Sequence, residues 1–263
     1  MREKIGEILE KQGIKTFGFC DFSLLKNCLL NCKAKERLPK NSKSVITVLF
    51  PYKVNIKKPK NISRYSAVLD YHILCLDILK NAVLKLNEIY PENVFEPFVD
   101  NSPINEVRAG VFCGLGVRGK NGLLINEKYG SFCFIGEIVT DLEISSEVLK
   151  NQDCIGCNIC LEKCPTGFLK DKNKKCLSAL TQQKGNLTDE ERQLILKNNT
   201  VWGCDICQEV CPLNKDKSLT DIKGFLESYR DEYKKGENIE KRAYAWRGEK
   251  VILRNAEILE ENQ

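Results

Sequence analysis

The feature that most constrains this chain is a run of four cysteines between Cys154 and Cys164. They are spaced Cys-x2-Cys-x2-Cys-x3-Cys, and Pro165 follows directly. This is the ferredoxin pattern for 4Fe–4S ligation, in which the first three thiolates bind one cluster and the fourth binds a second. Two-residue loops let successive thiolates converge on one cluster, and the proline turns the chain away from a regular helix. The run therefore predicts two 4Fe–4S clusters.

A second group of cysteines supplies the remaining ligands. It reads Cys-x2-Cys-x3-Cys over 204–211, and Cys176 lies alone between the groups. The first cluster is assigned Cys154, Cys157, Cys160 and Cys211, and the second is assigned Cys164, Cys176, Cys204 and Cys207. Two zinc sites or a set of disulfides are the alternatives, because zinc also binds Cys-x2-Cys pairs. The uninterrupted run ending in proline favours iron–sulfur clusters.

Length and composition are those of an ordinary globular protein. The 263 residues, 42% hydrophobic and 29% charged, suffice for one large domain or two modest ones. The N-terminus carries acids where a signal peptide has an apolar core, and no apolar run approaches about 18 residues, so we expect a cytoplasmic protein that does not bind a membrane. In a reducing compartment the 14 cysteines are metal ligands or buried thiols. The net charge of +5 permits a polyanionic partner without requiring one.

The residue pattern predicts an α+β fold. We expect a mixed α/β sandwich, a mixed sheet flanked by helices, over 1–145, a ferredoxin-like double-cluster domain over 146–220, and a short helical tail over 221–263. Helices are expected over 1–13, 24–32, 66–90, 104–113, 188–198 and from Ile239 onward. Strands are expected over 16–20, 44–52 and 94–100, and a hairpin from 123–126 and 129–141. The lysine-rich segment 53–62 is expected to be a solvated loop.

Three stretches outside the cysteines contain candidate site residues. Asp100 ends the predicted strand 94–100, where capping of the next helix is its ordinary role. The segment 114–122 is rich in glycine, so its backbone can approach a large ligand, but it is not the Gly-x-Gly-x-x-Gly of a dinucleotide site. The string from Asp70 to Cys75 lacks the glycine of the cobalt-ligating Asp-x-His-x-x-Gly motif. Because His72 falls within a predicted helix, we reject it as a cobalt ligand.

In combination these stretches resemble the epoxyqueuosine reductase family over nearly the whole chain. The resemblance is carried by the eight-cysteine pattern and by residues 63–65, 70–72, 98–106, 114–120, 130–137 and 246–259. Such enzymes carry a cobalamin and two 4Fe–4S clusters, and they reduce the epoxide of epoxyqueuosine to queuosine in a tRNA anticodon. They are relatives of reductive dehalogenases.

The resemblance also implies roles for particular residues. It implies that Asp100 is the general acid, which requires a raised pKa in a dry pocket. It implies a cobalamin near the glycine-rich loop with no protein ligand on cobalt. The candidate cofactor-binding residues are Arg64, Tyr71, His72, Gly114, Gly116, Arg118 and Lys120. The alternative for these side chains is an ordinary solvated turn or helix packing. An external electron donor and a monomeric protein are further expectations.

The sequence departs from the family pattern at three places. The family has Glu-Arg where this chain has Glu106-Val107, and an aromatic residue where it has Val117. Most members continue into helical repeats that hold tRNA, whereas this sequence ends at Gln263, so we expect a short member that lacks them and binds tRNA weakly. The alternative functions are a reductase of a small epoxide, halide or corrinoid, and a ferredoxin-like electron carrier without cobalamin.

Overall fold

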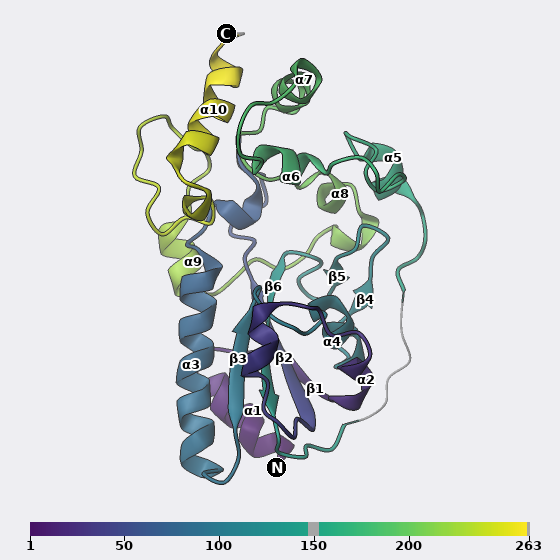
Figure 1. Cartoon of the computed structure of the whole chain (residues 1–263), viewed down its shortest axis with the longest axis vertical. Coiled ribbons are helices and arrows are strands. Elements are labelled where there is room, and N and C mark those ends of the chain that lie inside the picture. Colours follow the sequence, from purple (N-terminus) through teal and green to yellow (C-terminus); the bar gives the residue numbers. More distant parts are fainter. Residues whose placement is uncertain (147–152, 262–263) are drawn as a thin grey trace. The chain divides into compact units, whose positions relative to one another are not determined.

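The computed structural model describes residues 1–146 and 153–261 (Figure 1). The chain divides into two compact units: unit 1 combines Met1–Pro51 with Tyr71–Ile155, and unit 2 combines Tyr52–Asp70 with Gly156–Gln263. This division does not follow the chain in order, because residues 52–70 pack with the C-terminal half. It also places the tail from 221 onward in the same unit as the cysteine-rich segment. Within the described ranges, no helix has the length and apolar character needed to cross a membrane.

The elements of each unit are short, apart from α3. The helices of unit 1 are α1 (Arg2–Lys11), α2 (Ser23–Lys26), η1 (Lys33–Arg37), α3 (Tyr71–Ile89) and α4 (Glu106–Phe112). Its strands are β1 (Phe17–Asp21), β2 (Ser44–Pro51), β3 (Phe95–Val99), β4 (Val117–Arg118), β5 (Leu124–Ile125) and β6 (Cys133–Thr140). The helices of unit 2 are η2 (Arg64–Ser66), α5 (Ile159–Lys163), α6 (Leu177–Thr181), α7 (Asp189–Lys197), α8 (Ile206–Glu209), η3 (Pro212–Asn214), α9 (Lys223–Ser228), η4 (Ala245–Arg247) and α10 (Glu249–Glu260).

A four-stranded sheet of order β1-β2-β6-β3 forms the centre of unit 1. The predicted α+β class is confirmed, but the sheet is not mixed, because its three pairings are all antiparallel. The reason is the position of β6. Strands β2 and β3 run in the same direction, as expected for strands joined through a helix, yet β6 lies between them and pairs with both.

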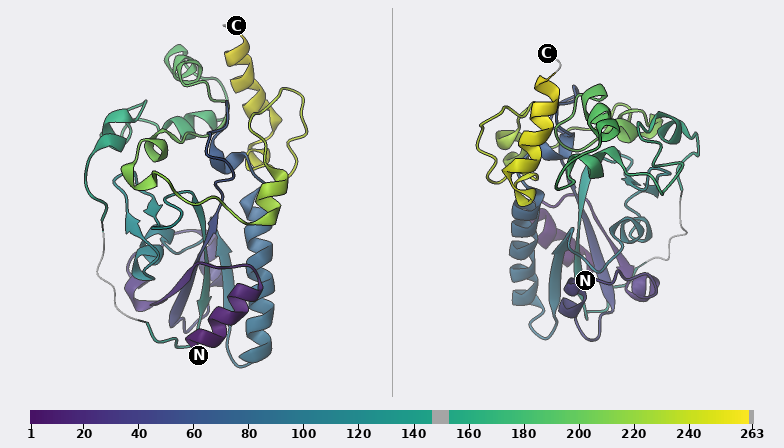
Figure 2. Two further views of the ribbon diagram at one scale, coloured as in Figure 1. Left: turned by 180° about the vertical axis from the view of Figure 1, so that it is seen from behind. Right: turned by 45° about the horizontal axis from the view of Figure 1, so that its top comes forward.

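The two faces of the sheet are covered by different helices. Helix α3 packs against β3 and β6 on one face, as Figures 1 and 2 show, while α4 packs against β1, β2 and β6. Gly136 allows the close approach of α3, because an added Cβ would lie 2.8 Å from Leu79 Cδ1. On the α4 face, Cys113 Sγ lies 3.3 Å from Thr47 Oγ1. Glu137 is the register partner of Thr47, so its side chain points to the α4 face.

Two predicted helices are shorter in the structure. The helix expected over 24–32 ends at Lys26, because the following backbone bonds elsewhere: the N–H of Leu30 donates to the carbonyl of Pro103 at 2.8 Å. The helix expected over 66–90 begins at Tyr71. The residue before it is Asp70, whose backbone N–H donates to the carbonyl of Lys241 at 2.9 Å and not to a carbonyl of the helix.

The hairpin expected from 123–126 and 129–141 is also wrong. β5 pairs with β4, while β6 pairs with the two longer strands β2 and β3. An isolated antiparallel bridge between Asn126 and Gly130 is the ladder contact that joins the two predicted arms. The longer β6 buries its apolar residues in the main sheet, which outweighs the local turn.

Unit 2 consists of short helices around a core that includes Trp202 and Tyr244. Helix α7 begins with the predicted capping box of Thr188 and Glu191. Helix α10 packs against α6 and α7, and its fully buried Asn255 donates to the carbonyls of Thr181 and Val201 at 2.7 and 2.8 Å. The tail helix starts at Glu249, ten residues later than the predicted Ile239.

Candidate active site and cluster module

Asp100 lies at the corner between β3 and α4. Its φ is +59°, a left-handed conformation that Asp tolerates better than most side chains. The N–H of Asn101 donates to Val99 at 2.8 Å, and that of Ser102 donates to Asp100 at 2.6 Å. This tight turn leaves the Asp100 carboxylate beyond the end of the strand, with 59% of its side chain exposed.

The carboxylate of Asp100 pairs with the only histidine of the chain. His72 Nε2 lies 3.0 Å from Asp100 Oδ2, and the His72 ring lies next to Tyr71, which stacks on Phe134 with 4.2 Å between ring centroids. The hydrogen bond from His72, with its charge, lowers the pKa of Asp100 although burial opposes this. The expected raised pKa in a dry pocket is therefore wrong for Asp100, because the group is half exposed beside a histidine.

Asp100 does not cap the helix that follows it. Asn105 is the N-cap of α4, and its Oδ1 accepts the N–H of Arg108 at 3.1 Å. The N–H of Asp100 instead donates to Glu106 Oε1 at 3.1 Å. The capping role that the sequence suggested for Asp100 is thus filled by Asn105, and Asp100 keeps its carboxylate for other partners.

Two more carboxyl groups, Glu106 and Glu137, lie behind Asp100. Burial, together with the negative charge of Asp100, raises the pKa of Glu106 to about 8. Glu137 is fully buried, and burial followed by the charge of Glu106 raises its pKa well above the ordinary value. Neither carboxyl oxygen of Glu137 has a hydrogen-bond partner among the described residues. Sequence analysis did not select these two groups, because their protonation depends on burial.

The glycine-rich loop presents only some of its predicted residues to a ligand. Gly114 is exposed with φ +74°, and Lys120 is exposed. Arg118 is exposed and lies 3.6 Å from Asp153. Gly116 has a different reason to be glycine, because an added Cβ would lie 2.4 Å from the carbonyl oxygen of Ile125. It allows β4 and β5 to pack closely.

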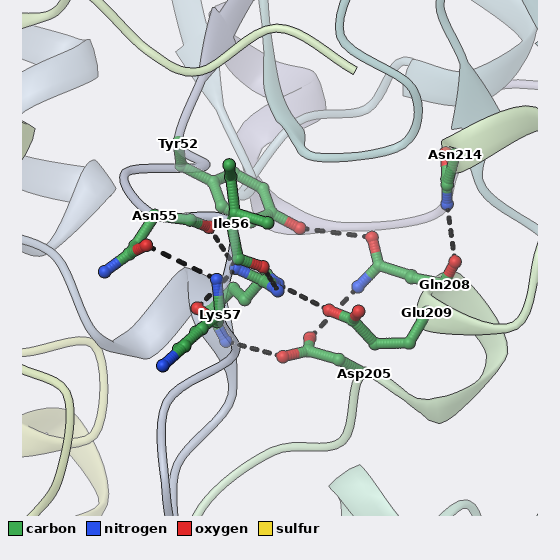
Figure 3. Close-up of polar contacts among 9 residues, drawn as sticks. Tyr52, Asn55, Ile56, Lys57, Asp205, Gln208, Glu209 and Asn214 are labelled. Atoms are coloured by element: carbon green, nitrogen blue, oxygen red, sulfur yellow. Dashed lines mark hydrogen bonds and ion pairs between the residues drawn. The ribbon is translucent and has the colours of Figure 1, made fainter. Parts of the chain in front are cut away.

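Arg64 has a structural role that the sequence did not reveal. It belongs to unit 2 and is only 4% exposed. Its Nε lies 2.5 Å from Glu209 Oε1, and its terminal nitrogens donate to three successive carbonyls, those of Asn55, Ile56 and Lys57, at 2.6, 2.8 and 3.1 Å (Figure 3). The prediction that Arg64 contacts a cofactor is corrected, since its guanidinium holds the loop 55–57. The loop 55–57, which is part of the segment 53–62 expected to be solvated, is therefore held in one conformation.

The cysteine-rich segment places most of its thiols at helix ends in unit 2. Cys160 lies in α5, which packs against α8, and Cys207 lies in α8. Cys164, Cys176 and Cys211 flank α5, α6 and η3. Cys154 belongs to unit 1, where its N–H donates to Arg118 at 3.0 Å.

The thiols assigned to the second cluster are electrostatic neighbours. Burial raises the pKa of Cys204 to about 11; the backbone N–H of Ile206 opposes this rise, and the charges of Asp205, Cys176 and Cys164 add to it. Burial, followed by Cys204 and Cys176, raises the pKa of Cys207 to about 12. The charges of Cys176 and Cys164 act on Cys204, and those of Cys204 and Cys176 act on Cys207, which is compatible with the ligand set assigned to the second cluster. Cys160 also acts on Cys207.

The donor chemistry of this set fits an iron–sulfur cluster. Burial raises the pKa of Cys164, but the N–H of Leu169 and the hydroxyl of Thr166 outweigh it and lower the pKa overall. Such donors stabilise a thiolate. Among the described residues, no three His, Cys, Asp or Glu side chains are grouped so as to hold a single metal ion. A 4Fe–4S cube is a larger ligand, since it is held by Cys thiolates on separate irons.

Comparison with known proteins first defines the class. A family model described as a 4Fe-4S double cluster binding domain matches residues 153–214, which include all eight predicted ligands. A second model, described as epoxyqueuosine reductase QueG, matches residues 33–101. This match includes Asp100. The chain thus carries a double-cluster module next to a segment typical of one group of oxidoreductases.

Whole-chain relatives then identify the family. The epoxyqueuosine reductase of Listeria monocytogenes is 30% identical over 302 aligned residues, which cover 98% of this chain and 80% of that protein. That of Cyclobacterium marinum is 35% identical over 156 residues, so the matched part spans 56% of this chain and only about half, 50%, of that relative. The chain belongs to the epoxyqueuosine reductase family.

Solved structures show the same fold. The epoxyqueuosine reductase of Streptococcus thermophilus superposes with a TM-score of 0.79 at 27% identity, covering 100% of this chain and 81% of that one. An epoxyqueuosine reductase bound to an epoxyqueuosine-modified tyrosine tRNA stem loop has a TM-score of 0.83 at 24% identity, covering 98% and 80%. These similarities confirm the fold class.

Proposed function

We propose that this protein reduces epoxyqueuosine in tRNA to queuosine, with cobalamin and two 4Fe–4S clusters as cofactors. The observation that carries the proposal is 30% identity to an epoxyqueuosine reductase over 98% of the chain. The solved relative in complex with a modified tRNA stem loop supports tRNA as the partner. The proposal includes an external electron donor, a monomeric protein and a cytoplasmic location.

In this proposal Asp100 delivers a proton to the epoxide oxygen. Removing that oxygen and leaving an alkene requires electrons at carbon and protons on the departing oxygen. The Asp100 carboxylate is exposed to a substrate, and the His72 Nε2 that can protonate it is 3.0 Å away. The lowered pKa of Asp100 keeps its carboxylate ionised at rest, so in this proposal the proton reaches Asp100 from His72 during the reaction.

Cobalamin would supply the two-electron donor that attacks carbon. The residues that would hold it are the exposed or half-exposed members of the predicted set: Tyr71, His72, Gly114, Arg118 and Lys120. The expectation that no histidine ligates cobalt is supported by the contact of His72 Nε2, in this single-histidine chain, with Asp100.

The ligand assignment of the eight cysteines is part of the proposal. Anaerobic iron and sulfide analysis of the intact protein should find about eight of each per chain. The Cys176→Ala variant should fall to about four of each, while Cys28→Ala, at a half-buried thiol outside the module, should keep both clusters. Retention of both clusters in Cys176→Ala would contradict the assignment.

The decisive experiment is conversion of the modified tRNA. The protein with full clusters and added cobalamin is reduced, incubated with epoxyqueuosine tRNA at low salt, and the nucleosides are analysed after digestion. We expect queuosine, in an amount that falls steeply as salt rises, since tRNA binding draws on basic side chains that release counterions. No product, with cobalamin bound, would favour a reductase of a small epoxide, halide or corrinoid. No cobalamin binding would favour an electron carrier.

A further inference from the structure

The proposed reaction needs two protons, and the pair formed by His72 and Asp100 supplies one at a time. When an epoxide becomes an alkene, both C–O bonds break, the two carbons gain a second bond between them, and the oxygen leaves as water. The balance is two electrons, from the reduced cofactor of the proposed function, and two protons. His72 and Asp100, whose Nε2 and Oδ2 atoms lie 3.0 Å apart, can deliver one proton at a time. A second proton must therefore reach Asp100 before the reaction is complete, and a neighbouring acid is one source of it.

Glu106 is placed for this role. It stands in the first turn of α4, fixed by the Asn105 cap, and its Oε1 accepts the N–H of Asp100 at 3.1 Å. In the neutral acid the proton then lies on the other oxygen, Oε2. The contact with the backbone of Asp100 and the mutual charge effect of the two carboxyl groups place Glu106 next to Asp100, so the inference assigns it proton transfer to the Asp100 carboxylate, directly or through one water molecule.

The surroundings of Glu106 keep it protonated near neutral pH. Burial and the charge of Asp100 raise its pKa to about 8, while the Asp100 N–H and the charge of His72 on α3 act in the opposite direction. On the sheet side it interacts with Glu137 of β6, which in turn faces Asp100 and Cys113. Three carboxyl groups and one histidine thus share a small volume, an arrangement that favours neutral acids.

We propose that Glu106 supplies the second proton, through Asp100. Asp100, protonated from His72, gives the first proton to the epoxide oxygen as one C–O bond breaks. Glu106 then reprotonates Asp100, which gives the second proton as the other C–O bond breaks and water leaves. His72 and Glu106 recover their protons from solvent. Glu106 does not touch the substrate, so it is a positioning residue that acts through Asp100.

The first test follows the pair without any turnover. Because His72 is the only histidine, its ring Cε1–H gives a single NMR signal in cluster-loaded protein carrying labelled histidine. In the wild type this signal should show a step at a pH of about 8, where Glu106 releases its proton. The step should vanish in Glu106→Gln and persist in Glu143→Gln, a control carboxylate with 83% of its side chain exposed. A wild-type titration without that step would overturn the proposal.

The second test follows the rate of reduction against pH. The wild-type turnover number should fall above a pH of about 8, because Glu106 loses its proton there. Glu106→Gln should lower the turnover number about 100-fold, leave KM unchanged and lose that pH dependence. Glu106→Asp, which keeps an acid on a shorter side chain, should recover part of the rate. An unchanged profile in Glu106→Gln would overturn the relay.

The two tests separate this inference from the proposed function on which it rests. If the wild type forms no queuosine, the proposed function fails, yet the histidine titration still decides whether Glu106 and Asp100 are coupled. If the wild type is active and Glu106→Gln behaves like Glu143→Gln in both experiments, the reaction stands and the role of Glu106 is excluded.

Discussion

The two units contain groups of ionisable side chains of opposite character. In unit 2, Arg64 makes hydrogen bonds with Glu209 and three carbonyls, and its N–H donates to Asp205 Oδ2 at 2.6 Å. In unit 1, Asp100, Glu106 and Glu137 are three acids with one histidine among them, and neither oxygen of Glu137 has a hydrogen bond of normal geometry among the described residues, although Ser102 opposes the rise in its pKa. One network is satisfied, and the other is not.

The difference indicates what each network is for. A buried polar network whose members are paired rigidifies its surroundings, and removing one member leaves the others with a large penalty. A group of acids that cannot all ionise is destabilising, and such groups are found at sites where proton transfer requires shifted pKa values. We therefore expect changes in the Arg64 network to alter folding, and changes in the carboxyl cluster to alter chemistry and pH dependence.

The largest expected effect is on the folding of unit 2. Arg64→Ala should lower the free energy of unfolding by about 3–5 kcal/mol, because it leaves half-buried Glu209 without its cation and the three carbonyls of the loop 55–57 without their donor. The measurement is chemical denaturation under anaerobic conditions. Arg192→Ala, which removes an ion pair with Glu261 at the surface, should cost about 1 kcal/mol or less. Equal losses in the two variants would contradict the comparison.

In unit 1 the corresponding change should affect turnover and leave folding intact. Asp100→Asn keeps the size of the side chain but cannot deliver a proton, so turnover should fall by about 100-fold or more. Cluster content should stay at the wild-type level, and the free energy of unfolding should change by about 0.5 kcal/mol or less, because the side chain is 59% exposed. Near wild-type turnover would remove Asp100 from the mechanism.

A smaller effect is expected from Glu137, in the pH dependence of stability. Its pKa in the folded protein is raised by burial, so above the unfolded pKa of about 4.3 the unfolded chain has released a proton that the folded chain retains. The free energy of unfolding therefore decreases as pH rises from about 5 to 8. Glu137→Gln removes this contribution.

Denaturation curves at pH values of about 5 and 8 measure that slope. The slope should be flatter in Glu137→Gln than in the wild type, while Glu143→Gln, at an exposed carboxylate, should keep it. If Glu137→Gln has the wild-type slope, Glu137 ionises in the folded protein with its ordinary pKa, and the proposed retention of its proton is wrong.

The smallest effect compares one helix cap from each unit. Asn105→Ala and Thr188→Ala each remove a side-chain acceptor at a helix start, and each should lower stability by about 1 kcal/mol. Only Asn105→Ala should also broaden or shift the His72 titration, because α4 carries Glu106. A Thr188→Ala variant with the same change would mean that the titration reports general stability.

Sequence analysis was reliable where spacing alone determines the structure. The strand 44–52 was predicted from its β-branched run, and the structure has β2 at Ser44–Pro51 with every residue buried. The capping box at Thr188 was predicted and is present. The double-cluster module followed from cysteine spacing and is matched over 153–214. In each case the pattern that carries the prediction lies within a short stretch of sequence.

It failed where the environment decides. Glu106 stands within the motif that pointed to Asp100, but only burial shows which of the two keeps its proton. Arg64 belongs to a family-like motif, yet its charged partner, Glu209, lies 145 residues away in sequence. The helix expected over 24–32 was lost to a tertiary hydrogen bond. Distant contacts set protonation, burial and element ends, and none of these follows from local spacing.

The interleaved order of the units has a consequence for how the chain acquires its structure during synthesis. Residues 52–70 leave the ribosome early, but the rest of their unit begins only at Gly156. At about 5–20 residues per second, they wait on the order of 10 s while the remaining residues of unit 1 are made. During that interval Arg64 has no Glu209 to bind, so the nascent chain displays a basic, lysine-rich loop. This loop is therefore accessible to a chaperone, or to the anionic ribosome surface, before the residues of unit 2 that pack against it have been synthesised.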